Sequence, residues 1–390
     1  MLYLAIDQHS KQLPLFGCRV IAATMCLLDS RRDGLGAVGQ YRHKNDPRER
    51  VSHDEDVIKL STTQINDSLP NHHSKARPRI IPTANGQGVP VGPIPRHPLA
   101  WQTRIMPLLG AHLSIAGGYY KAVEAAQRAG CEVVQLFTKN NNQWRAKPIG
   151  EEDVSLFAAA LREHKIGQPL SHASYLINLA SGNPELWEKS VAGMVVELQR
   201  AAQLGIAYVV VHPGAHTGQT EAEGIANVVR AIDEIHRRLP DAASQILLES
   251  TAGQGTCLGC RFEQLAAMIG GVQEPSRLGI CVDTCHLFAA GYPLIDRRDY
   301  LQTFRDLDKT VGLQRIKAFH LNDSKKDLGS RVDRHEHIGC GKLGLAPFAH
   351  LLNDKRFRKV PMYLETPKGL NDDGEDWDVV NLRSLRELID

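Results

Sequence analysis

Short apolar runs alternate with longer amphipathic stretches from Met106 to the end of the chain. The apolar runs are about six residues long and rich in β-branched side chains, a pattern typical of buried parallel strands. They cover residues 108–113, 132–137, 169–174, 207–212, 245–249, 278–283, 315–321 and 360–365. Helical periodicity marks stretches between them, including residues 119–130, 184–204, 221–239 and 300–311.

Eight strands that alternate with helices over 285 residues predict an α/β fold whose parallel sheet closes into a (β/α)₈ TIM barrel. An open, doubly wound sheet is the alternative. No Gly-x-Gly-x-x-Gly motif follows the first run, however, and we interpret Gly117-Gly118 as the turn into a helix. We therefore expect a barrel domain over residues 106–390.

The first 105 residues differ from the rest in charge and pattern. They carry a net charge of +5 and the remaining residues −3, and they show little sustained periodicity. Prolines and glycines crowd their last part, between Pro78 and Pro98. Such composition buries too little apolar surface to offset the entropy of ordering, so we interpret residues 1–105 as a disordered extension or linker. A regulatory or DNA-tethering arm and a start codon wrongly assigned upstream of Met106 are the alternatives.

Composition also limits the cellular location. No run of 18 uninterrupted apolar residues exists, which excludes a transmembrane helix, and Arg19 interrupts the most apolar N-terminal stretch, which argues against a secretory signal. Eight cysteines are too few for a disulfide scaffold. The isolated pair Cys257 and Cys260 is interpreted as part of a Gly-rich loop. We expect a cytoplasmic protein with reduced cysteines and no membrane partner.

The third to eighth strands all end on His, Asp or Glu, and chemistry in such barrels lies at the carboxyl ends of the strands. Any one of these residues could be an ordinary hydrogen-bonded group. Together, so many unpaired imidazoles and carboxylates at one mouth would be strongly unfavourable unless divalent metal ions supplied compensating charge. The candidate ligands are His172, His212, Glu249, Asp283, His286, His320, Asp333, His335 and Glu365.

The types of ligand indicate which metal to expect. Imidazole and carboxylate groups without a required thiolate favour Zn²⁺, with Mn²⁺ and Fe²⁺ as weaker competitors. At three or four protein ligands for each ion, nine residues suffice for three ions, with a carboxylate shared between two of them.

Nine short motifs follow one another along the chain from the first predicted strand onward. They are Gly110-Ala-His-Leu-Ser114, Phe137-Thr-Lys-Asn140, Gln143-Trp-Arg145, Ser174-Tyr-Leu-Ile-Asn-Leu179, His212-Pro-Gly214, Thr251-Ala-Gly-Gln-Gly255, Asp283-Thr-Cys-His286, His320-Leu-Asn-Asp323 and Ser330-Arg-Val-Asp-Arg-His335. These motifs resemble those of the endonuclease IV family, the zinc-dependent apurinic/apyrimidinic (AP) endonucleases, and the resemblance runs from about Met106 to the C-terminus.

The resemblance implies a TIM barrel with three zinc ions and divides the ligands among them. His172 and His212 would hold the first ion. Asp283, His320 and Glu365 would hold the second, with Glu249 bridging these two ions and orienting the attacking hydroxide. The third would be held by His286, Asp333 and His335. The implied reaction is hydrolysis of the phosphodiester on the 5′ side of an abasic site in double-stranded DNA, which leaves a 3′-hydroxyl and a 5′-deoxyribose phosphate. The family also suggests a monomer.

DNA contacts carry over from the family less completely. Tyr175 and Leu176 match residues that the family inserts into the duplex at the lesion. Asn142 stands where relatives often have arginine, and Cys340 stands where some have glutamate. Basic side chains expected to contact phosphates are Lys139, Arg145 and Arg331, with Lys325 and Arg334 as further candidates.

Two other functions are consistent with parts of this pattern. A metal-dependent sugar isomerase or epimerase of the same barrel type would use a set such as Glu249, Asp283, His320 and Glu365. The additional histidines and Asp333 argue against it. A DNA-damage binding protein without catalytic activity is the third possibility, and it predicts binding of abasic duplexes without incision.

Overall fold

The computed structural model describes residues 106–390, so the predictions for residues 1–105 lie outside the described residues. Eight parallel strands close into a barrel in the order β1-β10-β7-β6-β5-β4-β3-β2. They are β1 (Leu109–His112), β2 (Val133–Phe137), β3 (Gly167–His172), β4 (Tyr208–Val211), β5 (Gln245–Glu249), β6 (Leu278–Asp283), β7 (Ile316–His320) and β10 (Met362–Leu364). All eight predicted strands are confirmed, and closure between β1 and β2 excludes the open sheet.

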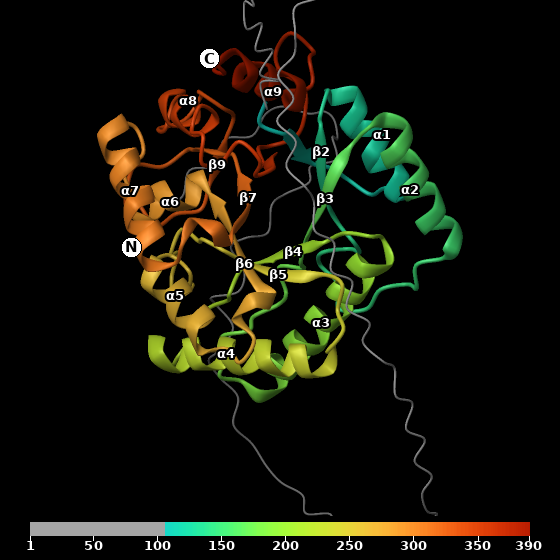
Figure 1. The fold of residues 1–390 in the computed structure, drawn as a ribbon, viewed down its shortest axis with the longest axis vertical. Coiled ribbons are helices and arrows are strands. Elements are labelled where there is room, and N and C mark those ends of the chain that lie inside the picture. The colour runs from blue at the N-terminus through green and yellow to red at the C-terminus, as the bar shows by residue number, and fades with distance from the viewer. Residues whose placement is uncertain (1–105) are drawn as a thin grey trace, which may run out of the picture. The chain divides into compact units, whose positions relative to one another are not determined.

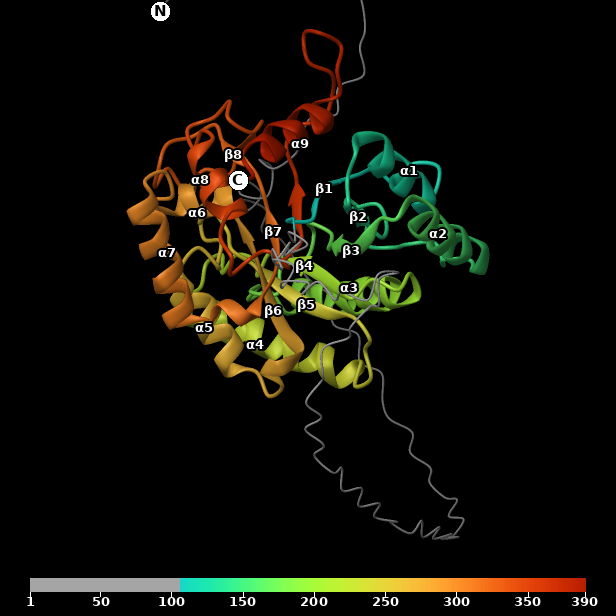
Figure 2. The same cartoon turned by 45° about the horizontal axis from the view of Figure 1, so that its top comes forward.

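Helices surround the ring of strands on its outside, as Figures 1 and 2 show. They are α1 (Tyr119–Ala129), α2 (Glu151–His164), α3 (Pro184–Gln203), α4 (Glu221–Arg238), α5 (Phe262–Gly271), α6 (Thr284–Ala290), α7 (Arg297–Thr310), α8 (Ala346–Leu352) and α9 (Trp377–Glu387). The four predicted helices correspond to α1, α3, α4 and α7. None of the helices between residues 106 and 390 combines the length and hydropathy that crossing a bilayer requires.

Local capping fixes where the longer helices begin. The side chain of Asn183 accepts a hydrogen bond from the amide of Leu186 at 2.9 Å, and Pro184 occupies the first turn of α3. At α4, Thr220 and Glu223 exchange the reciprocal hydrogen bonds of a capping box. These signals place the helix starts immediately after the polar loops that follow β3 and β4.

The hydrophobic core has two parts. The larger part fills the space between strands and helices and includes Val134, Leu136, Ile246 and Leu248. The smaller part fills the barrel, with one side chain from each of seven strands: Val133, Leu170, Val210, Leu247, Cys281, Ala318 and Tyr363. Strand β1 has Gly110 at this level, because a Cβ there would collide with the carbonyl oxygen of Val133.

A two-stranded hairpin, β8 (Asp323–Ser324) paired with β9 (His335–Glu336), follows β7. No disulfide joins any of the cysteines within the described barrel. Cys281 and Cys285 are fully buried.

Candidate metal centre

A layer of polar side chains lies directly above the barrel's inner apolar layer. Residues two apart on a strand share a face, so the residue two positions after each apolar one also points inward, one step nearer the mouth. In all seven strands that residue is polar: Gln135, His172, His212, Glu249, Asp283, His320 and Glu365. Six of the seven are predicted metal ligands, and the strand period alone brings them together.

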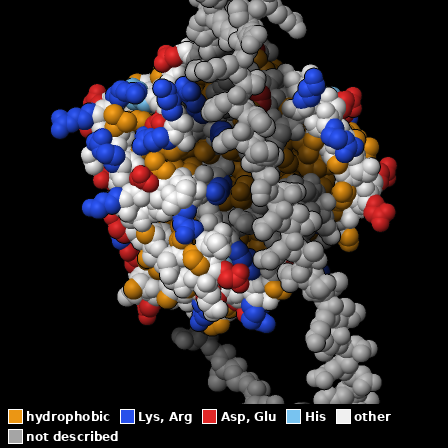
Figure 3. All heavy atoms as spheres, viewed as in Figure 1, with side chains coloured by type: hydrophobic (Ala, Val, Ile, Leu, Met, Phe, Trp, Pro, Cys, Tyr) orange, Lys and Arg blue, Asp and Glu red, His pale blue; other side chains and the backbone are white. Residues whose placement is uncertain are grey.

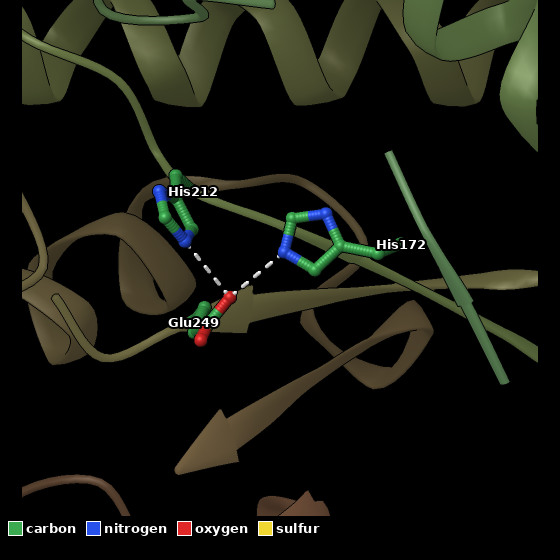
Figure 4. A group of neighbouring side chains, drawn as sticks. All are labelled: His172, His212 and Glu249. Carbon is green, nitrogen blue, oxygen red and sulfur yellow. Dashed lines mark hydrogen bonds and ion pairs between the residues drawn. The ribbon is translucent and has the colours of Figure 1, made fainter. Parts of the chain in front are cut away.

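Glu249, at the end of β5, lies at the centre of this layer and is fully buried. Its Oε2 lies 3.1 Å from Nε2 of His172 and 3.1 Å from Nε2 of His212. Figure 4 shows the two imidazoles approaching this one oxygen from different sides. Three neighbouring strand ends thus supply one group of potential metal ligands.

The other oxygen of Glu249 faces a second group. Oε1 lies 2.8 Å from Nδ1 of His320, and this nitrogen is 3.2 Å from Oε2 of Glu365. Asp283 completes the group, with its Oδ2 3.9 Å from the same nitrogen. A carboxylate that directs its two oxygens to two sets of donors has the arrangement of a bridging ligand.

A third group forms between α6 and the hairpin. Nε2 of His286 lies 3.1 Å from Oδ2 of Asp333, and Nε2 of His335 lies 3.3 Å from Oδ1. Asp283 positions His286 by capping α6, because its Oδ1 accepts the backbone N–H of His286 at 2.8 Å. Asp333 and His335 come from the segment that ends in β9. All nine predicted ligands therefore lie in one cluster at the mouth, which we call the mouth cluster.

The charges of the mouth cluster favour protonated imidazoles when no metal is bound. Burial by itself lowers the pKa of His286, but the carboxylates of Asp283 and Asp333 raise it well above its ordinary value. For His172, burial again acts downward, and Glu249 raises the pKa above its ordinary value. Protonated His172 and His286 thus offset part of the negative charge of the buried acids.

The acids show the opposite balance. Burial would raise the pKa of Glu249, but the charges of His320 and His212 hold it well below its ordinary value. The pKa values of Asp333 and Glu365 are lowered by neighbouring histidines in the same way, against the effect of burial. The carboxylates of Glu249, Asp333 and Glu365 are therefore ionised and can bind a cation.

The distances within the mouth cluster fit divalent metal ions. Zinc–ligand bonds of about 2.0 Å in tetrahedral geometry place ligand atoms about 3.3 Å apart. Five pairs of donor atoms in the first and third groups lie 3.1 to 3.5 Å apart: His172–Glu249, His212–Glu249, His286–Asp333, His335–Asp333 and His286–His335. Within residues 106–390, no ion pair joins any of the four carboxylates to Lys or Arg. The donor set, and acids that in this part of the chain are paired only with histidines, both fit the binding of divalent metal ions.

Comparison with known proteins agrees with this geometry. Residues 123–388 match the family of xylose isomerase-like TIM barrels. A probable endonuclease 4 of Geobacter sp. (strain M21) is 49% identical over 285 residues, which cover 73% of this chain and 100% of that protein. The crystal structure of endonuclease IV from Thermus thermophilus matches with a TM-score of 0.64 at 39% identity, over 72% of this chain and 98% of that one. The chain belongs to the endonuclease IV family.

Solved structures at lower sequence identity show the likeness of the fold. A D-tagatose 3-epimerase-like protein matches with a TM-score of 0.54 at 19% identity, over 72% of this chain and 96% of that one. The epimerase alternative uses only metal ligands such as Glu249, Asp283, His320 and Glu365. It therefore gives no role to the third group of the mouth cluster, which consists of His286, Asp333 and His335.

Three residues beside the mouth cluster are not among the predicted ligands, although His112 and Cys285 lie in motifs quoted above. Gln135 and His112 contact Glu365, and Cys285 lies beside Asp333 and His335. Burial raises the pKa of the Cys285 thiol to about 12, so it is protonated at neutral pH. For Gln135 the signal is present in the sequence, since it lies two residues after a barrel-filling valine.

The side chains that the endonuclease IV resemblance assigns to DNA mostly lie at the surface. Tyr175 is 53% exposed, with its ring against Phe137 and His172, and Leu176 beside it is partly buried. The exposed residues Asn142, Arg145 and Arg331 are accessible to a ligand; Lys325 is exposed and Arg334 is partly buried. Figure 3 shows Lys and Arg side chains gathered over the region of α7, α8 and β9. The role in DNA binding of the predicted contacts named in this paragraph stays a prediction.

Lys139, another predicted phosphate contact, does not lie at the surface, and its role in DNA binding stays a prediction. Its ammonium group lies 3.1 Å from Oε1 of Glu197 and donates a hydrogen bond to the carbonyl of Gln143, and its side chain is 4% exposed. Glu197, on α3, also accepts hydrogen bonds from Thr138 Oγ1 and the backbone N–H of Ser174. The Lys139–Glu197 pair therefore connects the loop after β2 to the loop after β3.

Proposed function

We propose that this protein is a zinc-dependent AP endonuclease (deoxyribonuclease IV), a DNA-repair enzyme that acts on abasic sites in duplex DNA. It cleaves the phosphodiester on the 5′ side of the abasic nucleotide. The observation that carries the proposal is the bridging position of Glu249, between His172 and His212 on one side and His320 on the other. The endonuclease 4 name of its relatives supports cleavage within a nucleic-acid chain.

Three zinc ions would be held by the three groups of the mouth cluster. The first would have His172, His212 and Glu249 as ligands, the second Glu249, Asp283, His320 and Glu365, and the third His286, Asp333 and His335. Bound zinc supplies a Lewis acid that lowers the pKa of water to about 7 and stabilises negative charge on a phosphate.

The chain's own residues position the reactants. Glu249 orients the attacking water in line with the bond from phosphorus to the 3′ oxygen of the preceding nucleotide. The new bond forms between the water oxygen and phosphorus, and the departing 3′ oxygen takes up a proton. The phosphate stays on the abasic sugar, so the products are a 3′-hydroxyl and a 5′-deoxyribose phosphate.

Substrate selection requires the abasic nucleotide to leave the helix, and its missing base lowers the energy needed for unstacking. Tyr175 is exposed beside the mouth cluster and, with Leu176, offers an aromatic and an aliphatic side chain to fill the gap in the duplex. Arg145 and Arg331 would contact the phosphate backbone. We expect the enzyme to act as a monomer in the cytoplasm.

An incision assay tests the proposal. The substrate is a duplex with one tetrahydrofuran abasic analogue, and the protein is used as purified, after chelation and after re-addition of Zn²⁺. We expect one incision product with a 3′-hydroxyl end, lost on chelation and restored by zinc. Binding without incision in the presence of zinc would favour the damage-binding alternative. Turnover of a ketose with Mn²⁺ and no incision would favour the epimerase.

A further inference from the structure

Three histidines of the mouth cluster are oriented by backbone carbonyl groups. In each, Nδ1 is hydrogen-bonded to a carbonyl oxygen and Nε2 faces the cluster. The contacts are His172 to Ala173 at 2.8 Å, His286 to Ser250 at 2.8 Å and His335 to Glu365 at 3.2 Å. Because a carbonyl oxygen only accepts, Nδ1 carries the hydrogen and Nε2 is free to bind a metal.

His320 has the opposite orientation. Its Nδ1 faces Glu249 and Glu365, and its Nε2 lies 2.7 Å from Oε1 of Gln135. The side-chain amide of Gln135 therefore orients the imidazole of His320, as backbone carbonyl groups orient those of His172, His286 and His335. Unlike a backbone carbonyl, this amide can be changed by mutation.

The amide of Gln135 has only one orientation that satisfies its neighbours. Nε2 donates to Oε1 of Glu365 at 2.5 Å and to Nδ1 of His112 at 2.9 Å. Turning the amide over would place its oxygen against the carboxylate of Glu365, with two acceptors facing each other. Glu365 thus fixes Gln135, and Gln135 in turn leaves only its oxygen for the Nε2–H of His320.

The same network fixes His112. Since its Nδ1 accepts from Gln135, its Nε2 carries the hydrogen, and this buried N–H has no acceptor among residues 106–390. A buried donor without an acceptor is unfavourable. The hydrogen bonds of Gln135 therefore satisfy Glu365 and His320 but leave one polar atom of His112 unpaired in the described part of the chain. This indicates that the network serves Glu365 and His320.

We propose that Gln135 is a positioning residue that fixes the tautomer of His320 and the orientation of Glu365, and so sets the affinity of the ion that these two residues share with Glu249 and Asp283. The inference rests on the proposed metal centre. Hydrogen-bond partners of metal ligands typically change metal affinity about 10- to 100-fold when removed. We expect a change of that size at one of the three ion positions.

The first experiment measures zinc affinity by competition with a chromophoric chelator, without DNA. We expect Gln135→Leu to release one ion at a chelator concentration roughly 10- to 100-fold lower than wild type, with the other two retained. Gln135→Met, an unbranched side chain of similar length, repeats the test if the leucine variant folds poorly. The matched control is Gln264→Leu, because buried Gln264 bonds the loop at Gly259 instead of a predicted ligand. The control should leave all three affinities unchanged.

The second experiment observes His320 directly by NMR of zinc-loaded protein with ¹⁵N-labelled histidine. Wild type should show a slowly exchanging Nε2–H on His320, and Gln135→Leu should lose it. Gln135→Glu separates the contact to His320 from the contact to Glu365. The new carboxylate still accepts a hydrogen bond from His320, so the Nε2–H signal should stay. Its negative charge repels Glu365, so zinc binding should weaken.

The outcomes distinguish this inference from the proposed function. Wild-type protein that binds no zinc would contradict the proposed function itself. Wild-type protein that binds three ions but shows no Nε2–H on His320, or leucine and methionine variants that bind all three ions as tightly as wild type, would overturn only the role of Gln135.

Discussion

Two buried glutamates, Glu197 on α3 and Glu249 at the end of β5, have opposite surroundings. Glu197 is 1% exposed and is paired with Lys139 at 3.1 Å, and it also accepts hydrogen bonds from Thr138 and Ser174. Its charge and its lone pairs are satisfied by the chain itself. Such an ion pair holds loops in place and needs no further partner.

Glu249 is equally buried but is paired only with imidazoles, and three more carboxylates lie close by. Without metal, the cluster can balance its charge only by protonating histidines. The comparison shows that a buried acid with a fixed cation is structural, whereas a group of buried acids with only titratable partners is suited to bind metal ions. Each prediction below tests one side of this difference.

The largest effect is expected for Glu249→Gln. The variant loses the bridging charge, so we expect it to lose zinc and to reduce incision of an abasic duplex by more than about 100-fold, above the range typical of residues that only support a ligand. Zinc content and incision rate are measured on the same sample. Glu197→Gln is the matched control and should keep its zinc; loss of zinc from both variants would show that global unfolding, not ligand loss, explains the effect.

Lys139→Met tests the other glutamate. Removing the cation leaves Glu197 buried and unpaired, so we expect the free energy of unfolding to fall by about 3–5 kcal/mol. Urea denaturation with zinc in excess measures it. The double variant Lys139→Met with Glu197→Met should recover most of the loss. An unchanged urea midpoint in the single variant would mean that the pair contributes nothing to stability.

The mouth cluster should also give the metal-free protein an unusual dependence on pH. His172, His286 and His320 have raised pKa values, so their protonation contributes to the free energy of unfolding. This contribution is complete below their ordinary pKa of 6.5 and is lost as the pH rises through the pKa values of the folded state. The pKa of Glu249 is lowered, so its ionised carboxylate contributes to stability above its ordinary pKa of 4.5, and this contribution is lost as the pH falls. Stability from the cluster is therefore greatest between these two values.

Bound zinc should remove the loss of stability at alkaline pH. Zinc binds neutral imidazoles, so its affinity rises as the histidines lose their protons. We expect the urea midpoint of chelated protein to fall between about pH 6.5 and pH 9, and that of zinc-loaded protein to hold or rise. Parallel profiles with and without zinc would contradict the assignment of these histidines as ligands.

The smallest effect is expected for the surface cations. Arg145→Ala or Arg331→Ala should each weaken DNA binding a few-fold and reduce the slope of log K against log salt by about 1, if each arginine contacts one phosphate. Lys139→Met should leave this slope unchanged in the temperature range where it is folded. Fluorescence anisotropy at several salt concentrations measures all three; a slope lowered by Lys139→Met would contradict its structural role.

Much of the fold could be predicted from the sequence because the strands alternate so regularly with helices. The same two-residue period places His172, Glu249 and His320 above barrel-filling residues, so the ligands on the strands could be found from the strand ends. Helix α6 was less visible, since it follows β6 without a polar loop and Asp283 is both the last strand residue and the helix cap.

Long-range contacts explain what the sequence analysis missed. Lys139 follows a strand in a polar loop, a position typical of an exposed side chain, and its partner Glu197 lies far along the chain on α3. The strand period places Gln135 in the polar layer, but glutamine is not a usual metal ligand, and its hydrogen bonds to Glu365 and His320 join three different strands.

Anomalous diffraction from crystals of the purified protein, collected on both sides of the zinc absorption edge, tests the central claim most directly. We predict three peaks within the mouth cluster, one in each group of ligands, with Glu249 between the first two. A map with no anomalous peak at Glu249, from protein that incises abasic DNA, would contradict the account.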